Sequence, residues 1–305
     1  MSFNTFKDYL NIAHSHYRPV ITFEPKNLSE RFAVGIELEL EGVHNTPDLN
    51  RTFWECVPDG SLRNHGLEIR CANPLSGAKL EKAIADLDEC LANMPYEISE
   101  RCSTHIHLDV TDMNGQQLLN FLLLSSMFEH LLFRLFGNTR LSNTFCMAVD
   151  SGTTNYDNIV TLGRDPTVSG AVDITWSKYA GISLNRLRDL GTVEFRMFCP
   201  ITTKESYTRV LEFLFALKRE ALSMETIQEI ILYKKSHTLG DVFSRLFPNE
   251  GYSAEYDRLL ERGVQVTNDL ITSIELNEYI STQTMGLHQQ INLLDNQIEE
   301  LQRGV

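Results

Sequence analysis

Three glutamates alternate with apolar residues in the stretch GIELELE, at Gly35–Glu41. Read as a strand, this stretch places Glu37, Glu39 and Glu41 on one face and the apolar side chains on the other. Like charges on one face repel each other, and a divalent cation between them converts that repulsion into attraction. Because oxygen ligands favour Mg2+ or Mn2+ over zinc or copper, the stretch predicts a metal site. The alternative is a solvated acidic face on a half-buried strand.

Three later segments, GLEIRC, STHIHLDV and TVEFRMF, also combine an apolar face with an ionisable face. They contribute Glu68 and Arg70, then His105, His107 and Asp109, then Glu194 and Arg196. Side by side in one curved sheet, these faces would line a single concave floor. Carboxylates that hold a divalent metal and arginines that bind phosphate are the groups needed for a metal–polyphosphate site. The alternative is a set of ordinary cross-strand ion pairs, each worth under about 1 kcal/mol.

Composition limits the classes of function. The chain has 27 basic and 41 acidic residues and a net charge of −14, which argues against non-specific binding to nucleic acid or to an anionic membrane. We expect no membrane span and no signal peptide. The six cysteines are scattered without a CxxC pair, which favours a reduced, cytoplasmic protein. The sequence has neither GxxxxGK[ST] nor GxGxxG, so P-loop and Rossmann nucleotide binding are not supported.

Periodicity predicts elements that could position these residues. Period-2 alternation predicts strands, and apolar residues at spacings of three and four predict helices. The expected strands are Phe32–Leu40, Trp54–Val57, Gly66–Cys71, Ser103–Val110, Tyr179–Leu184 and Thr192–Phe198, the last two joined by a turn near Asp189–Gly191. The expected helices are a short one within Asn4–Tyr17, then Gly77–Asn93, Gly115–Phe136 and Lys204–Glu220. Asn138–Ser169 is expected to be a long loop.

This order of elements indicates an α+β fold: an antiparallel sheet with helices packed on one face and a helical C-terminal extension. Gly115–Phe136 is apolar nearly all round and is therefore expected to be buried. We expect an N-terminal arm at 1–30, a catalytic domain at 31–225 and a helical region at 226–305. Leu287–Leu301 carries a short heptad-like seam, which indicates a coiled-coil-like helix and a possible homo-oligomer.

Five segments in a fixed order resemble the amidoligase family. They are GIELELE, DGSL followed by GLEIRCANPLSG, CSTHIHLDV, SSMFEHLLFRLFG with Arg140 after it, and KYAGISLNRLRDLGTVEFRMF. That family belongs to the carboxylate–amine ligase superfamily, with glutamine synthetase and γ-glutamylcysteine ligase. The resemblance covers Arg31–Glu220 and implies a curved sheet, like the glutamine synthetase catalytic domain, that cups ATP and two or three Mg2+ or Mn2+ ions.

The resemblance also implies roles for individual residues. As metal ligands it implies Glu37, Glu39, Glu68, Glu194 and His107. As residues that bind the nucleotide or substrate it implies Arg140, Lys178, Asn185, Arg196 and His105. Arg196 and His107 would act directly in catalysis, and Asp59 would orient the substrate amine. The segment Cys199–Thr202 departs from the glycine-containing segment usual in the family, which leaves the identity of the substrate open.

Three functions follow as hypotheses. The first is an ATP-dependent ligase that joins a small-molecule or peptide carboxylate to an amine through an acyl phosphate, without nucleic acid or membrane partners. The second is a two-metal phosphohydrolase or a kinase that uses the same metal site. The third is a non-catalytic binding or assembly module that keeps the fold.

Overall fold

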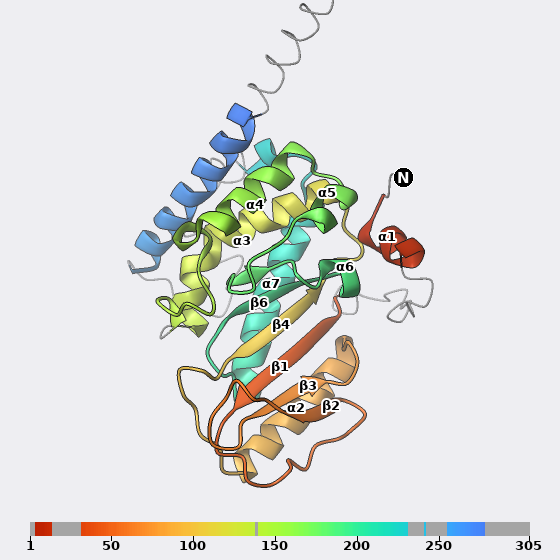
Figure 1. Cartoon of the computed structure of the whole chain (residues 1–305), viewed down its shortest axis with the longest axis vertical. Coiled ribbons are helices and arrows are strands. Elements are labelled where there is room, and N and C mark those ends of the chain that lie inside the picture. The colour runs from red at the N-terminus through yellow and green to blue at the C-terminus, as the bar shows by residue number, and fades with distance from the viewer. Residues whose placement is uncertain (1–3, 14–31, 138–139, 231–240, 242–254, 278–305) are drawn as a thin grey trace, which may run out of the picture.

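A six-stranded, fully antiparallel sheet forms the centre of the molecule (Figure 1). The computed structural model describes residues 4–13, 32–137, 140–230, 241 and 255–277. The strands are β1 (Val34–Leu40), β2 (Trp54–Pro58), β3 (Leu67–Cys71), β4 (Thr104–Asp109), β5 (Ile182–Ser183) and β6 (Thr192–Phe198). Their order across the sheet is β2-β3-β1-β4-β6-β5. The four strands that carry the ionisable residues are therefore neighbours, in the order β3, β1, β4 and β6.

The alternation expected in β1 is present. Its side chains are buried and half-buried in strict turn from Val34 to Leu40, so one face enters the core and the glutamates lie on the other. The pairing of β1 with β4 sets Glu37 opposite His105 and Gly35 opposite His107. The ionisable face is thus continuous from strand to strand.

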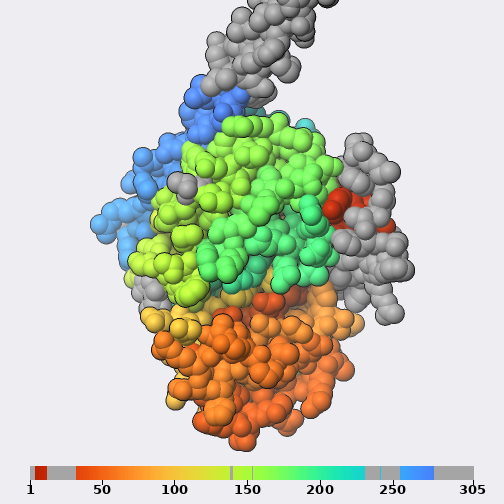
Figure 2. All heavy atoms as spheres, in the orientation of Figure 1, coloured from red at the N-terminus to blue at the C-terminus, as the bar shows by residue number. Residues whose placement is uncertain are grey.

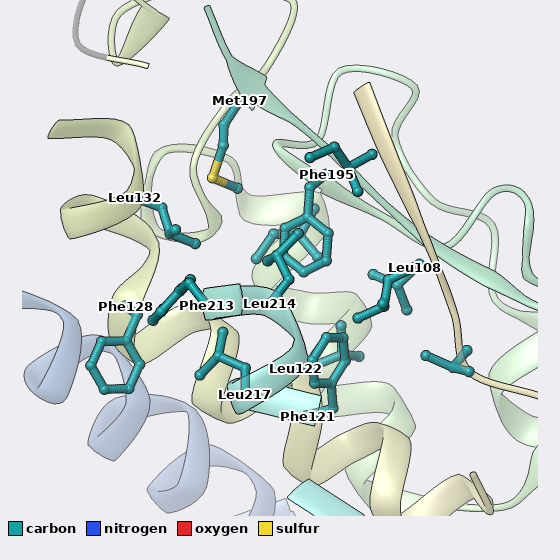
Figure 3. Packing of buried hydrophobic residues seen from close by; sticks show 14 of the residues in the cluster. Leu108, Phe121, Leu122, Phe128, Leu132, Phe195, Met197, Phe213, Leu214 and Leu217 are labelled. Carbon is teal, nitrogen blue, oxygen red and sulfur yellow. The ribbon is translucent and has the colours of Figure 1, made fainter. Parts of the chain in front are cut away.

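Helices α2 (Gly77–Asn93), α3 (Gly115–Phe136) and α7 (Lys204–Ser223) pack together behind the sheet (Figure 1). The rings of Phe121 and Phe195 join α3 to β6, with centroids 6.0 Å apart, and the rings of Phe128 and Phe213 join α3 to α7 at 5.7 Å. Figure 3 shows these rings among the leucines of α3 and α7. This apolar layer turns the ionisable face of the sheet away from the core.

Helix α3 begins and ends as its sequence indicates. Asn114 and Gln117 form a reciprocal capping box at its first turn, and Gly137 donates its backbone N–H to the carbonyl of Phe133 at its end. By length and composition alone α3 could cross a membrane, contrary to the expectation of no membrane span, although most of its side chains are buried inside the protein. Burial on all sides is the position expected for α3 as a core helix.

A second helical layer covers the other side of α3, and here the expected long loop at Asn138–Ser169 is wrong. The described part of this segment contains a 3-10 turn (η3, Val149–Ser151), α4 (Thr153–Arg164) and the start of α5 (Val168–Asp173). Helix α4 is rich in polar and β-branched residues with low helix propensity, and packing overrides that propensity. Helical residues 255–277 also lie on this side. The Thr267 hydroxyl donates to the carbonyl of Leu123, and the Tyr156 hydroxyl lies 2.8 Å from Ser273 Oγ.

Smaller differences lie at the ends of the chain and of the sheet. The N-terminal helix is α1 (Phe6–Ala13), whose Phe6 is fully buried and whose backbone bonds to Met113. The strand expected at Tyr179–Leu184 is only β5, because Ala180 pairs instead with Met147. The turn before β6 contains a one-turn helix, α6 (Leu187–Leu190), which ends at Gly191 with φ +66°, in the left-handed region that glycine adopts without strain.

These observations confirm the α+β class and the antiparallel sheet with helices on one face. The heptad-like seam at Leu287–Leu301 lies outside the described residues.

Candidate metal centre

Glu37, His107 and Glu194 come together on the open face of the sheet from three adjacent strands. His107 Nε2 lies 3.2 Å from Glu37 Oε1 and 3.9 Å from Glu194 Oε1. One potential ligand atom from each of the three residues lies within 4.8 Å of the other two. His107 and Glu194 are buried and Glu37 is half-buried, so the three form a built cluster rather than a solvated strand face. We call it the first ligand group.

The orientation of His107 depends on a glycine in the neighbouring strand. Gly35 lies directly opposite His107, and a Cβ built on Gly35 would lie 3.4 Å from His107 Cβ and 4.0 Å from its Cδ2. On the other side of the ring, His107 Nδ1 lies 3.4 Å from Thr192 Oγ1. His107 Nε2 is buried and has no hydrogen-bond partner, since its approach to Glu37 is not aligned for a hydrogen bond. A buried imidazole nitrogen with this freedom is a fitting metal ligand.

A second cluster lies further along β1. Glu39, Asp59 and Glu68 each bring a carboxylate oxygen within 4.8 Å of the other two, and all three are half-buried. Glu39 and Glu68 lie opposite each other across β1 and β3. Asp59 comes from the turn after β2, where it also accepts the backbone N–H of Ser61 at 2.8 Å. We call these carboxylates the second ligand group.

His105 and Ser103 connect the two ligand groups. His105 Nδ1 lies 3.2 Å from Glu37 Oε2, and its Nε2 lies 2.9 Å from Ser103 Oγ. Ser103 in turn donates a short hydrogen bond to Glu39. The chain Glu37–His105–Ser103–Glu39 therefore holds the two β1 glutamates in fixed orientations from the neighbouring strand.

The carboxylates of the two groups differ in their electrostatic surroundings. Burial raises the pKa of Glu37, but the adjacent imidazoles of His105 and His107 outweigh it and hold that pKa well below its usual range. Burial also raises the pKa of Glu68, as do the charges of Glu37, Glu39 and Asp59, with Arg70 opposing them. The second ligand group thus has an excess of negative charge that a cation would neutralise.

Arg196 lies beside the first ligand group, whereas Arg140 donates hydrogen bonds to backbone carbonyls. Arg196 forms a close ion pair with Glu194, and its Nε is buried without a partner. Arg140 is buried and donates to the carbonyls of Cys102 at 3.0 Å and Arg196 at 3.4 Å. It therefore positions the segment before Ser103 and the strand that carries Arg196.

The remaining expected residues lie outside both groups. Lys178 is exposed, with its Nζ 4.8 Å from the centre of the Tyr179 ring. Asn185 is exposed, and its backbone N–H bonds to Ser183 Oγ at 3.3 Å. Arg70, from the same sheet, is paired with Glu55 at 3.1 Å and with Glu68 at 3.7 Å.

A cavity of about 270 Å3 borders the first ligand group at the His107–Thr192 end. Glu37, His107 and Arg70 form part of its wall, and the rest is mostly apolar or backbone. Figure 2 shows β1 in a hollow between the orange and the green parts of the surface. The first ligand group therefore adjoins a concave, partly apolar space of the kind that holds small molecules.

Two hydroxyl residues, Ser103 and Thr192, also contact the ligand groups and were not among the expected site residues. Ser103 lies two residues before His105 in STHIHLDV, so the same period-2 argument places it on the ionisable face. Thr192 likewise precedes Glu194 by two residues. Both carry neutral hydroxyls, so a pattern of ionisable side chains does not reveal them.

Comparison of the chain with protein-family models and with curated proteins finds no match.

Proposed function

We propose that the open face of the sheet binds ATP through divalent metal ions and that the protein is an ATP-dependent carboxylate–amine ligase of the amidoligase type. One observation supports this most strongly: two ligand groups share one strand, through Glu37 and Glu39. Alternate residues on a strand face lie about 7 Å apart, and carboxylates reaching toward each other from there can hold two cations on one polyphosphate. A solvated acidic face does not explain why His105 and His107, which both lie beside Glu37, are buried.

The donor set fits Mg2+ or Mn2+. Glu37, His107 and Glu194 would hold one ion, and Glu39, Asp59 and Glu68 would hold the other. The ions would supply Lewis-acid neutralisation of the phosphate charge. An overall charge of −14 makes this requirement stronger, since the metal-free face repels a triphosphate.

The reaction proposed is a phosphoryl transfer followed by an acyl transfer. An oxygen of the substrate carboxylate attacks the γ-phosphorus, and the bond to ADP breaks to leave an acyl phosphate. The amine nitrogen then attacks the carbonyl carbon, phosphate leaves, and a proton is released as the amide forms. Arg196 would exchange its contact with Glu194 for the transferred phosphate, and Asp59 would orient the neutral amine by accepting its N–H with a carboxylate oxygen that does not face the metal.

The apolar cavity beside His107 supports the placement of the nucleotide. Its position puts a base within reach of a polyphosphate that starts at the first ligand group, and its wall offers the apolar surface that a heterocycle prefers.

The fold and the chemistry of the cysteines support the same reading. An antiparallel sheet with helices on one face and carboxylates on the other is what a glutamine synthetase-like catalytic domain requires. None of the six cysteines, all of which lie in the described residues, forms a disulfide. We infer from these thiols and from the use of ATP that the protein works in the cytoplasm.

The test needs no knowledge of the amine. Melting temperature is measured with Mg·ATP and with ATP plus EDTA for wild type, Glu37→Gln and Glu194→Gln. Glu55→Gln is the matched control, because Glu55 is an exposed carboxylate of the same sheet paired with Arg70. We expect stabilisation by Mg·ATP only in wild type and the control. Equal stabilisation of all four proteins would contradict the proposal that Glu37 and Glu194 hold a metal ion that binds ATP.

A second measurement separates the ligase from the other metal-dependent reactions. Hydroxylamine intercepts an acyl phosphate and gives a hydroxamate, which is detected colorimetrically while candidate carboxylates are screened. We expect ADP and hydroxamate in equal amounts. ADP release without a carboxylate would indicate a phosphohydrolase, and a stable phosphorylated product that resists hydroxylamine would indicate a kinase.

A further inference from the structure

Four exposed apolar side chains border the Arg196 end of the open face. Leu141, Phe145 and Tyr179 are 43%, 51% and 37% exposed, and Ile98 on the adjoining segment is 53% exposed. The Phe145 and Tyr179 rings meet edge to face, with centroids 5.7 Å apart. We call these four residues the apolar rim. Exposed aromatic surface of this kind is unusual on a free protein surface and marks sites that bind a partner.

Hydrogen bonds join the segments of the rim to one another. The Asn143 side chain donates to the carbonyl of Glu100 at 3.1 Å, which links the Leu141–Phe145 segment to that of Ile98. The backbone N–H of Met147 donates to the carbonyl of Tyr179 at 2.7 Å. Figure 2 shows the yellow and lime segments meeting on one side of the molecule. Hydrogen bonds therefore join the segments of the apolar rim into one continuous surface.

The same segments reach the candidate metal centre. The carbonyl of Gly181 accepts the backbone N–H of Arg196 at 2.8 Å, and Tyr179 precedes Gly181 by two residues, at most about 7 Å of chain. Arg140 binds the carbonyl of Cys102, the residue before Ser103. The rim thus lies at the end of the floor opposite the apolar cavity, where the nucleotide would not cover it.

Charge at the rim favours a ligand with a carboxylate. Lys178 Nζ lies over the Tyr179 ring, and a second cation, Arg196, lies beside Glu194 of the first ligand group. A free acidic amino acid whose carboxylate reaches Arg196 has no further apolar side chain with which to cover the aromatic pair. An extended peptide, at about 3.3–3.6 Å per residue, carries such a side chain on a nearby residue.

We propose that the apolar rim binds a peptide, and that the carboxylate substrate of the ligase is a peptide with an apolar or aromatic residue within about three positions of the reacting carboxylate. This inference rests on the proposed function and adds the class of substrate. The aromatic pair would supply the contact area, and Lys178 would attract the peptide's negative charge.

The experiment compares N-acetyl-Phe-Leu-Glu, N-acetyl-Ser-Ser-Glu and free glutamate as carboxylate substrates, in hydroxamate formation and in calorimetric binding with Mg2+ and a non-hydrolysable ATP analogue. The rim variant is Phe145→Ser with Tyr179→Ser. Leu276→Ser is the control, because Leu276 is 55% exposed on helical residues 255–277. We expect the apolar peptide to bind wild type and the control at least tenfold more tightly than the rim variant, and more tightly than the other two probes.

Other results would overturn the inference. They are equal binding of the three probes, failure of the apolar peptide to bind, an unchanged affinity in the rim variant, or a dimer that only the rim variant loses in light scattering. The last would assign the rim to a second copy of the chain. Stabilisation of wild type by Mg·ATP keeps the two proposals distinguishable. If Mg·ATP stabilises wild type but the rim variant binds the peptide normally, only the peptide proposal is rejected. If Mg·ATP does not stabilise wild type, the metal–nucleotide site is rejected.

Discussion

Glu37 and His107 lie on neighbouring antiparallel strands and bring Oε1 within 3.2 Å of Nε2, although they are two residues out of register. The residue directly opposite His107 is Gly35, which has no side chain to fill the space between them. The imidazole can therefore lean across β1 toward the carboxylate. This relationship is what turns two polar strand faces into one ligand group.

Replacing Gly35 with Val should disturb that relationship without unfolding the protein. A valine places γ-methyl groups where the His107 ring now lies, and its Cβ would already be 3.4 Å from His107 Cβ. Because valine favours strands, we expect little loss of melting temperature but at least a tenfold loss of Mg·ATP affinity, about 1.4 kcal/mol. Gly152→Ala is the control, since its Cβ would make only ordinary contacts from 3.6 Å. Unchanged calorimetric affinity in Gly35→Val would show that His107 does not contribute to binding.

The two ligand groups should bind metal separately. Mn2+ titration followed by electron paramagnetic resonance, with a non-hydrolysable ATP analogue present, should give two ions per wild-type chain. Asp59→Asn or Glu68→Gln removes a charge from the second group only, so one ion should remain. A stoichiometry of two in both variants would reject the second group as a metal site.

Glu129 should make stability depend on pH. Burial raises the pKa of this carboxyl to about 8, the neighbouring Asp150 raises it further, and the Val149 N–H opposes them. A pKa raised above its unfolded value means that the folded state binds the extra proton, so stability is greatest below the unfolded pKa of 4.5 and falls until pH passes about 8. The slope approaches about 1.4 kcal/mol per pH unit at its steepest.

The variant Glu129→Gln isolates this effect. A glutamine keeps an oxygen to accept the Val149 N–H, which Glu129 Oε2 now accepts at 2.7 Å, and it cannot ionise. Between pH 6 and pH 9 wild type should therefore lose more melting temperature than the variant. Parallel curves for the two proteins would show that Glu129 does not titrate in this range.

Lys218 should stabilise the fold from a fully buried position. Its Nζ donates to the carbonyl of Asp109 and lies near Asp112 Oδ1, each at 2.7 Å, with the Phe32 ring 4.7 Å away. Lys218→Met leaves a buried carbonyl without its donor, and we expect a loss of about 2–3 kcal/mol in urea unfolding. Lys178→Met is the matched control at an exposed site and should change stability by under about 0.5 kcal/mol. Equal losses in both variants would reject a special role for the buried cation.

The sequence by itself determined which side chains could share the open face. In a strand, side chains alternate between faces whatever the surroundings, so GIELELE, STHIHLDV and TVEFRMF each separate apolar from ionisable residues by local geometry alone. Helices α2 and α3 were equally predictable, because their apolar residues follow helical spacing and α3 is capped by residues next to it in sequence. Helix α4 was not, because its own residues favour helix weakly and its packing against α3 decides its structure.

Only the tertiary structure decided which of these side chains meet. The register between β4 and β6 sets His107 opposite Glu194, residues 87 positions apart, and no local preference determines a pairing at that distance. The turn after β2 brings Asp59 to Glu39 and Glu68, while the buried Arg140 donates to the backbone carbonyls of Cys102 and Arg196. The physical reason is that strand order and register follow from packing the apolar faces on α2, α3 and α7, a global property of the chain, whereas the two faces of each strand are set residue by residue.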